Sequence, residues 1–341
     1  MSNSPEIIFV VGNSRSGTTM LNLILGKHSD IFALHELHFI ESLISPEQIL
    51  SGYVPSREEA ETILSTLLRS QRERPYSNSD LSKYLSEAVS ILNNCGNNLT
   101  SMEIFSCFCT YETKKHGKKI ACEQTPKNIY YVNEILKTLP NTKFINMYRD
   151  PRDIMLSQKR KWRRRFLGAK QVPLFRETFR SWLNYHPIIM AKLWNSAINK
   201  SLEFSDENHF LNVKFEDLLN NSESQIQRIC QFINIDYQEE MQKVPHEGSS
   251  SGVDKINKIG IDKSKQANWD NGGLNNGEIG ICQSICDTNM LKLGYERKTI
   301  NSIWFWWVIY GISSSFKMAG ALIFNLSRTK NLFSTIKRRL G

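Results

Sequence analysis

The chain has 341 residues, of which 40% are hydrophobic, so we expect one large domain with insertions, or one domain with an appendage. The 43 Lys and Arg residues exceed the 34 Asp and Glu residues, and the formal net charge of +9 suggests an anionic ligand or surface. No nucleic-acid-binding motif accompanies this charge, so nucleic acid is not an expected partner.

The N-terminal segment MSNSPEIIFVV lacks the basic and apolar regions of a signal peptide. Its apolar run, residues 7–11, leads into a glycine-rich loop and is predicted to be a buried strand. The seven cysteines are scattered, odd in number and without a C-x-x-C pair, which favours a reducing compartment. We therefore expect a cytoplasmic protein.

Strands and helices alternate along the chain. After the first strand, a second short strand is predicted at residues 31–34. Further strands are predicted at 119–123, 143–148 and 209–215, each followed by a helical pattern. Residues 45–118 are polar and mostly helical. The stretches SREEAETILSTLL and SDLSKYLSEAVSIL each begin with a predicted serine cap, although Cys107 and Cys109 alternate as in a strand. This order predicts an α/β fold, a P-loop NTPase-like parallel sheet with helices on both faces. We assign residues 1–300 to this domain, a helical insertion to about 45–118, and an apolar, basic tail to 301–341.

The glycine loop, residues 12–19 (GNSRSGTT), follows the first strand and opens a helix. Such a loop aims backbone N–H groups and the positive end of a helix dipole at an anion. A Walker A loop has lysine where this chain has Thr18, and Arg15 lies inside the loop instead. The ligand is therefore expected to lack the distal phosphates that this lysine reaches, unless the glycine pair is accidental.

A second anion site is predicted after the fourth strand, in FINMYRDPRDIMLSQKRKW. A P-loop NTPase would place a magnesium-binding aspartate near here, but this strand ends at Arg149. Pro151 then suits the first turn of a helix, and Ser157 follows about two turns later. A guanidinium and a nearby hydroxyl can together bind a phosphate, so the expected ligand has two separated anionic groups.

The segments RSGTT and YRDPRDIMLS together resemble the sulfotransferase family that uses 3′-phosphoadenosine 5′-phosphosulfate. Weaker similarities occur at TPKN, at NVKFEDLL before QFINID, and at MLKLGYE, so the resemblance spans about residues 5–297. The motif order is most similar to the bacterial and tyrosylprotein branches. The resemblance implies a donor without a γ-phosphate, which accounts for the missing lysine, and no requirement for a metal.

The resemblance also implies roles for individual residues. Contacts with the 5′-phosphosulfate of the donor are implied for Arg15, Ser16, Gly17, Thr18 and Thr19. Contacts with the 3′-phosphate are implied for Arg149 and Ser157. Arg15 would also stabilise transition-state charge. In the tyrosylprotein branch the glutamate of this loop acts as the base, which implies that role for Glu36. Two departures stand out: Gln124 replaces a frequent lysine, so Lys127 or Arg15 alone would supply that charge, and Phe215 replaces a common tyrosine.

Other motifs leave alternatives open. HELHF, with His35 and His38, is read as a base or acceptor contact at Glu36, as an ordinary polar loop, or as a broken zinc motif, because a zinc helix spaces its histidines by four. KRKWRRR, residues 159–165, is either a solvated face or a cationic rim. Cys282 and Cys286 are expected in a helix core.

The tail, from residue 301, allows three interpretations. Residues 303–326 approach the length of a membrane span, but three serines and Lys317 interrupt them. Trp304, Trp306 and Trp307, with the basic residues 337–339, suit a membrane surface and its anionic headgroups. Docking on the protein core is the third possibility.

The sequence therefore predicts a sulfotransferase that acts on a hydroxyl acceptor. A nucleotide kinase or NTPase is the alternative enzyme, although it should have a Walker lysine and a strand-end aspartate. A non-catalytic nucleotide-binding module is the other alternative, because Gln124 removes a cation. Carbohydrate, lipid and small-molecule acceptors stay open, and protein tyrosine is disfavoured because no secretory signal is seen.

Overall fold

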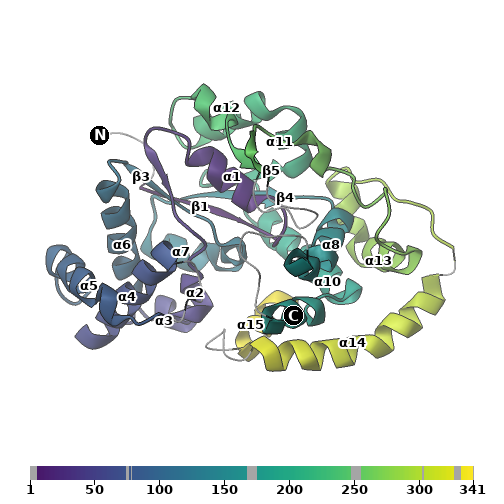
Figure 1. Cartoon of the computed structure of the whole chain (residues 1–341), viewed down its shortest axis with the longest axis horizontal. Helices are drawn as coiled ribbons and strands as arrows, with labels where there is room; N and C mark the ends of the chain where they lie inside the picture. Colours follow the sequence, from purple (N-terminus) through teal and green to yellow (C-terminus); the bar gives the residue numbers. More distant parts are fainter. Residues whose placement is uncertain are drawn as a thin grey trace.

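A five-stranded parallel sheet forms the centre of the protein (Figure 1). The computed structural model describes residues 6–73, 77, 79–166, 175–246, 255–301, 303–325 and 332–340. In spatial order the strands are β2 (Ile31–Ala33), β3 (Ile120–Glu123), β1 (Ile7–Gly12), β4 (Lys143–Tyr148) and β5 (Phe210–Lys214). All neighbouring pairs are parallel. The α/β prediction and its five strands are confirmed.

The central strand β1 is buried along its whole length. Alternate side chains point to opposite faces of the sheet, so Phe9 packs with Phe105 and Phe144 on one face. Ile8 and Val10 pack into the core on the other face. A strand that is covered on both faces needs a continuous apolar run, which explains the sequence IIFVV.

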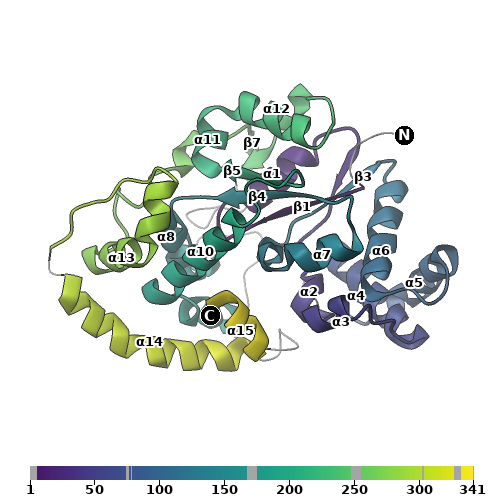
Figure 2. The ribbon, with the colours of Figure 1, turned by 180° about the vertical axis from the view of Figure 1, so that it is seen from behind.

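Helices cover both faces of the sheet. One face is covered by α1 (Thr18–Leu25), α11 (Phe215–Asn220) and α12 (Ser222–Phe232). The other face is covered by α6 (Ser101–Lys115), the 3-10 helix η1 (Pro126–Tyr131), α7 (Val132–Thr138) and α10 (Pro187–Leu202). Figure 2 shows α7 and α10 on the side of the sheet opposite α11 and α12.

The chain between β2 and β3 forms a layer of helices. It consists of the irregular turn α2 (Phe39–Ser42), then α3 (Pro46–Leu50), α4 (Arg57–Glu73), α5 (Ser82–Cys95) and α6. Ser56 caps α4 as predicted, since its Oγ accepts from the Glu59 amide at 3.2 Å. The serine cap predicted for α5 is wrong, because that helix begins at Ser82 and has Leu81 at its N-cap. The strand suggested by Cys107 and Cys109 is also wrong, since both lie in α6 and Cys109 packs in the core.

The remaining elements follow β4. They are α8 (Pro151–Arg160), η2 (Lys161–Phe166), α9 (Phe175–Leu183), η3 (Glu239–Gln242), β6 (Pro245–His246), β7 (Lys255–Ile259), η4 (Lys263–Lys265), α13 (Asn276–Lys292), α14 (Ile303–Asn325) and α15 (Leu332–Leu340). Strands β6 and β7 pair antiparallel, apart from the main sheet. Cys282 and Cys286 are fully buried in α13, as expected.

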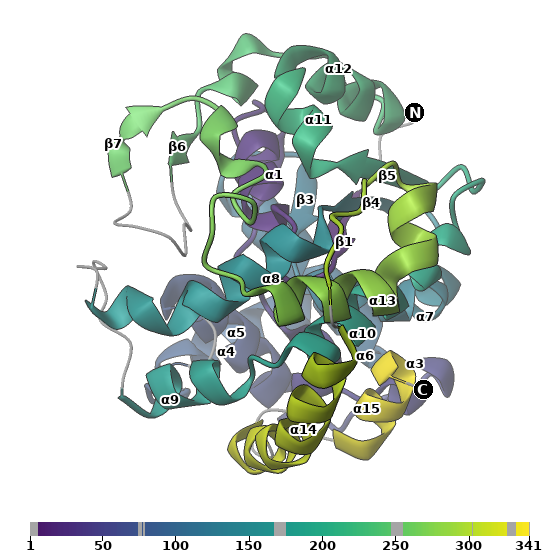
Figure 3. The same cartoon turned by 90° about the vertical axis from the view of Figure 1, so that its right-hand side faces the viewer.

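The tail helix α14 lies along the protein, against α9, α10 and α13 (Figure 3). Within the described residues, 303–324 form one helix long and apolar enough to cross a membrane, with a mean hydropathy of 1.3. One face of this helix is bonded to the protein: His186 Nε2 lies 3.1 Å from Ser313 Oγ, and Lys317 Nζ donates to the Trp182 carbonyl at 3.0 Å. The structure therefore shows the docked arrangement among the three interpretations of the tail.

Candidate active site at the carboxyl edge of the sheet

The two predicted anion motifs begin side by side. Strands β1 and β4 are neighbours, and Gly12, the last residue of β1, is in register with Met147 of β4. The glycine loop and the Arg149 segment therefore leave the sheet at the same edge. Ligands of open α/β sheets bind at this carboxyl edge, beside the strand where the order of connections reverses. Here that strand is β1, with β3 on one side and β4 on the other.

The glycine loop has a backbone that few residue types can adopt. Gly17 has a φ of +96°, and a Cβ built on it would lie 2.3 Å from Phe215 Cδ2. Arg15 also has a positive φ, 76°. Such a conformation costs a non-glycine residue about 1–3 kcal/mol, and strain of this kind is concentrated at functional sites. Helix α1 begins at Thr18, so its N-terminal amides open onto this loop.

Arg149 is held beside the glycine loop by an aromatic ring and a carboxylate. Its guanidinium lies over the Phe215 ring, 4.3 Å from the centroid. Its Nη2 donates to Asp153 Oδ2 at 3.1 Å and also to the carbonyl oxygen of Lys265. Phe215 thus packs between Gly17 and Arg149, which gives a role to the residue that departs from the common tyrosine.

A direct contact joins the two anion motifs. Arg15 Nε donates to Ser157 Oγ at 3.0 Å, across 142 positions of sequence. Ser157 lies in α8 and Arg15 in the glycine loop, so the two segments predicted to bind the two ends of one ligand meet in the folded chain. This contact is the strongest geometric support for a single site with two anion-binding parts.

Gln124 lies against the glycine loop, immediately after β3. Its Nε2 donates to Thr18 Oγ1 at 3.0 Å, and its Oε1 accepts from Thr19 Oγ1 at 3.5 Å. The amide that replaces the family's frequent lysine therefore binds the first two hydroxyls of α1. It contributes neutral hydrogen bonds and no positive charge.

Glu36 lies in the loop between β2 and α2, surrounded by cations from three other segments. Burial raises the pKa of Glu36, and the charges of Lys161, Lys127 and Arg15 act in the opposite direction. The side chain nonetheless keeps 38% of its surface exposed, and its Oε1 lies 3.3 Å from Nε2 of His38. The structure thus brings the predicted base near enough to Arg15 and Lys127 for their charges to act on it. A carboxylate that is both reachable and desolvated is suited to proton transfer.

Glu123 is a site residue that the sequence reasoning missed. It is the last residue of β3, and burial raises its pKa to about 7. Its carboxylate accepts from the Leu37 amide at 3.4 Å and from the Thr125 amide at 3.1 Å. It therefore holds together the loop that carries Glu36 and the loop that follows Gln124. An acidic residue at the end of an apolar strand, in KIACE, was the available signal.

The basic segment 159–165, at the end of α8 and in η2, gives support to each of its two interpretations. Lys161 contributes positive charge at Glu36, which fits a cationic rim. Lys159 instead forms an ion pair with Glu278 at 2.7 Å, and Arg163 is exposed beside Trp162. The side chains of residues 164–166 lie outside the described part of the structure.

No metal cluster is seen in the site or elsewhere in the described ranges, where three or more His, Cys, Asp or Glu side chains never gather closely enough to hold an ion.

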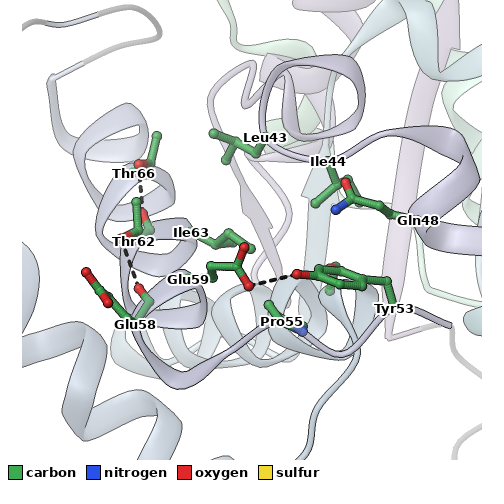
Figure 4. Close-up of a pocket in the computed structure, with 11 residues that line it drawn as sticks. Leu43, Ile44, Gln48, Tyr53, Pro55, Glu58, Glu59, Thr62, Ile63 and Thr66 are labelled. Carbon is green, nitrogen blue, oxygen red and sulfur yellow. Dashed lines mark hydrogen bonds between the residues drawn. The ribbon is translucent and has the colours of Figure 1, made fainter. Parts of the chain in front are cut away.

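A cavity of about 450 Å³ occurs between α4 and the segment that includes α3 (Figure 4). It is lined by Glu58 and Glu59, and Glu59 accepts from the Tyr53 hydroxyl at 2.8 Å. These carboxylates suit no anionic ligand, and the lining includes none of the predicted site residues.

The comparison with protein families decides the class of this site. A model described as "Sulfotransferase family" matches residues 5–239, a range that includes the glycine loop, Glu36, Arg149 and Ser157. The chain belongs to the sulfotransferase family. The kinase and NTPase alternative is thereby excluded, and the protein is a transferase.

Two kinds of relative agree with this assignment. A Caenorhabditis briggsae protein named "Putative protein-tyrosine sulfotransferase" is 25% identical to this sulfotransferase over 250 residues, 71% of this chain and 70% of the relative. Among solved structures, the sulfotransferase domain from the curacin biosynthetic pathway has a TM-score of 0.53 at 18% identity, covering 86% of this chain and 99% of the domain. The sulfotransferase domain from the Synechococcus PCC 7002 olefin synthase also has a TM-score of 0.53, at 17% identity, covering 87% and 98%. These structures support the fold.

Proposed function

We propose that this sulfotransferase moves the sulfuryl group of 3′-phosphoadenosine 5′-phosphosulfate to a hydroxyl acceptor. The Arg15–Ser157 contact is the observation that supports this donor best, because it joins two anion-binding segments into one site. A donor with a 5′-phosphosulfate and a 3′-phosphate needs two such segments.

Two buried polar atoms support the fit of such a donor. Ser16 Oγ and Arg149 Nε are both buried, and neither has a hydrogen-bond partner among the described residues. A buried donor without a partner costs about 1–3 kcal/mol, and a phosphate or sulfuryl oxygen bound here would supply the missing partner. One of them lies in each anion motif.

The proposed assignments follow the two motifs. The glycine loop, residues 15–19, would hold the 5′-phosphosulfate through its amides and the hydroxyls of Ser16, Thr18 and Thr19. Arg149 and Ser157 would hold the 3′-phosphate, the arginine as a planar fork. A cation at the end of β4, where a P-loop NTPase has a magnesium-binding aspartate, leaves the proposed site without a need for metal.

The chain's own residues would carry out the transfer by positioning and electrostatics. When bound, the donor supplies an activated sulfuryl group. Arg15 and the amides at the start of α1 would stabilise the negative charge that develops during transfer, and fixed donors of this kind are typically the largest contribution to catalysis. Glu36 would accept the acceptor's hydroxyl proton, because its carboxylate is reachable from solvent and close to Arg15.

The donor assignment has a direct binding test. The protein should bind 3′-phosphoadenosine 5′-phosphate in buffer with a chelator as tightly as without it, because Arg149 takes the place of a metal-binding carboxylate. ATP should bind much more weakly, because Thr18 replaces the lysine that reaches distal phosphates. Isothermal calorimetry with both nucleotides, each with and without EDTA, measures this. A preference for ATP, or binding lost with EDTA, would contradict the donor assignment.

We further propose that the outer face of α14 lies on a membrane surface. This face exposes Trp304 (73%), Ile312 (67%) and Phe316 (79%), and the neighbouring helix α9 exposes Phe175 (71%). Tryptophans favour the membrane–water interface, and the net charge of +9 complements anionic headgroups. The contacts of Tyr310, Ser313 and Lys317 with the protein follow the inner face, so a span would have to break them all. An interfacial helix is therefore favoured over a span.

Vesicle binding tests the membrane surface. Wild-type protein should co-sediment with phosphatidylcholine–phosphatidylserine vesicles, and Trp304→Ser/Ile312→Ser/Phe316→Ser should stay in the supernatant. Each large apolar side chain contributes about 1.5–3 kcal/mol when buried, so three removals should weaken binding by more than about 100-fold. The control replaces the exposed Leu50, Val54 and Leu85 of the helical layer with serine. Equal vesicle binding by both triple variants would contradict the proposal, and protein that resists an alkaline wash would indicate a span.

We propose a domain of residues 1–300 with its helical insertion at about 45–118, followed by the tail 301–341. All seven cysteines are free thiols, which supports a reducing compartment such as the cytoplasm. A lipid, carbohydrate or small-molecule hydroxyl at a membrane surface is the acceptor class that fits both proposals. Tyrosine in a protein, suggested by the name of the nematode relative, is a further candidate.

A further inference from the structure

The C-terminal helix α15 is clamped onto η1, the segment that carries Lys127. Arg338 Nη1 donates to the Tyr130 carbonyl at 3.0 Å, a contact between residues 208 positions apart. Arg338 also forms an ion pair with Glu134 and lies over the Tyr131 ring, 4.8 Å from its centroid. The basic end of the tail therefore binds protein groups here. The clamp brings α15 within reach of the loop that contains Glu36.

Arg339 completes a buried cluster around Glu41. It donates to both carboxylate oxygens of Glu41, the Tyr131 hydroxyl donates to one of them, and Lys127 Nζ donates to the other at 3.0 Å. The Glu41 side chain is 1% exposed. Burial by itself would raise the pKa of Glu41, but the Arg339 and Lys127 charges outweigh it and lower the pKa. The cluster is thus an ionised carboxylate shared by two cations.

Backbone strain marks the same place. Glu41 has a φ of 76° and His38 a φ of 52°, in the short segment that connects Glu36 to the cluster. Such residues persist only where the surroundings over-determine them, and they gather at functional sites. The contacts of Arg339, Tyr131 and Lys127 with Glu41 supply that constraint.

Lys127 connects the cluster to the proposed base. It lies near enough to Glu36 for its charge to oppose the rise in the Glu36 pKa, and its own pKa is lowered by burial. It also follows Gln124, which binds the glycine loop, by three residues. A displacement of η1 would therefore move a cation relative to both the base and the donor site.

We propose that α15 is a working part of the active site, in which Arg339 is a positioning residue that holds Glu41 and thereby fixes Lys127 beside Glu36. This inference rests on the proposed function, because it takes Glu36 as the base. It gives the tail a catalytic purpose beyond membrane contact. The tail that would bind the membrane surface would thus also fix the positive charge of Lys127 near the base.

The direction of the effect follows from the charges around the two carboxylates. Three cations act on Glu36, namely Arg15, Lys127 and Lys161. His38 and the buried carboxyl of Glu123 also lie near Glu36. Arg339, Lys127 and the Tyr131 hydroxyl face Glu41. Without Arg339, the Glu41 charge is balanced by Lys127 alone and draws Lys127 more strongly toward itself. Both changes add negative charge or remove positive charge near Glu36, so the pKa of Glu36 should rise.

The test compares Arg339→Gln, Arg339→Lys and Lys337→Gln in the full-length chain. Lys337 is an exposed residue of the same helix, so its variant is matched in charge and place. Carboxyl-carbon NMR of glutamate-labelled protein measures the Glu36 pKa, with the signal assigned by its loss in Glu36→Gln. Arg339→Gln should raise this pKa and lower kcat by about 10–100-fold, the range expected when a reacting group is misplaced. Affinity for 3′-phosphoadenosine 5′-phosphate should stay unchanged.

The control variants decide the interpretation. Arg339→Lys should restore most of kcat and of the Glu36 pKa, and Lys337→Gln should match wild type. An Arg339→Gln protein with wild-type kcat and Glu36 pKa would overturn the proposal. If Arg339→Gln unfolds, the double variant Glu41→Gln/Arg339→Gln removes the buried carboxylate charge as well. A folded double variant with wild-type kcat and wild-type Glu36 pKa would also overturn the proposal. Lack of nucleotide binding in wild type would contradict the proposed function separately, because the NMR titration needs no nucleotide.

Discussion

Arg149→Glu is expected to weaken binding of 3′-phosphoadenosine 5′-phosphate by more than about 100-fold. A hydrogen bond to a charged group contributes about 1.5–3 kcal/mol, and the new carboxylate would also repel the nucleotide phosphate. Stacking on Phe215 and the bond to Asp153 hold this guanidinium in place, and its buried Nε has no hydrogen-bond partner among the described residues. Calorimetry on the purified variant measures the loss.

Two further variants separate the phosphate contact from a general effect of charge or folding. Arg228→Glu makes the same charge change on α12, where the arginine is exposed, and should bind nucleotide like wild type. Arg149→Lys keeps the charge but loses the planar fork, so intermediate affinity is expected. A melting curve checks that Arg149→Glu is folded. If the folded variant binds 3′-phosphoadenosine 5′-phosphate with wild-type affinity, Arg149 is not a donor-binding residue.

Glu36→Gln is expected to lower kcat by about 10²–10⁴-fold, the usual contribution of a general base. Affinity for 3′-phosphoadenosine 5′-phosphate should change little, because the carboxylate is not assigned to the donor phosphates. Glu61→Gln makes the equivalent change on α4, where the carboxylate pairs with Arg57, and should leave both quantities unchanged. Normal turnover by Glu36→Gln with loss of activity in His38→Ala would assign the base to the histidine of the same loop.

The pH dependence gives a second measure of the same residue. Burial raises the pKa of Glu36 above the ordinary carboxylate value of 4.5. The base form is the ionised one, so kcat should fall as the pH drops through this raised pKa, at a higher pH than for an exposed glutamate. A histidine base would instead place the loss near its own pKa of about 6.5, and Glu36→Gln would keep that profile.

Local patterns predicted most of the sheet and the two anion motifs. The apolar run at β1 is continuous because both faces of the sheet are covered, whereas Asn146 and Asn212 interrupt the runs at β4 and β5. The glycine loop and the Arg149–Ser157 spacing are short-range features that depend on turn geometry and one helix start. Patterns of this kind are visible within ten residues of sequence.

Contacts between distant segments could not be predicted in the same way. The Arg339–Glu41 pair joins residues 298 positions apart, and the sequence around either residue gives no indication of its partner. The basic end of the tail suggested lipid headgroups, yet Arg338 and Arg339 bind protein carboxylates. Gln124 was recognised only as a missing lysine, whereas its hydrogen bonds to Thr18 and Thr19 depend on how β3 lies beside β1.

The most direct test of the account is a transfer assay with 3′-phosphoadenosine 5′-phosphosulfate and a lipid and polar extract of the source cells as acceptor. Mass spectrometry follows both the release of 3′-phosphoadenosine 5′-phosphate and the appearance of sulfated products, in the presence of EDTA. We expect wild-type protein to form a sulfated hydroxyl compound that Glu36→Gln and Arg149→Glu form much more slowly. Donor that stays intact with wild-type protein, or equal product formation by all three proteins, would contradict it.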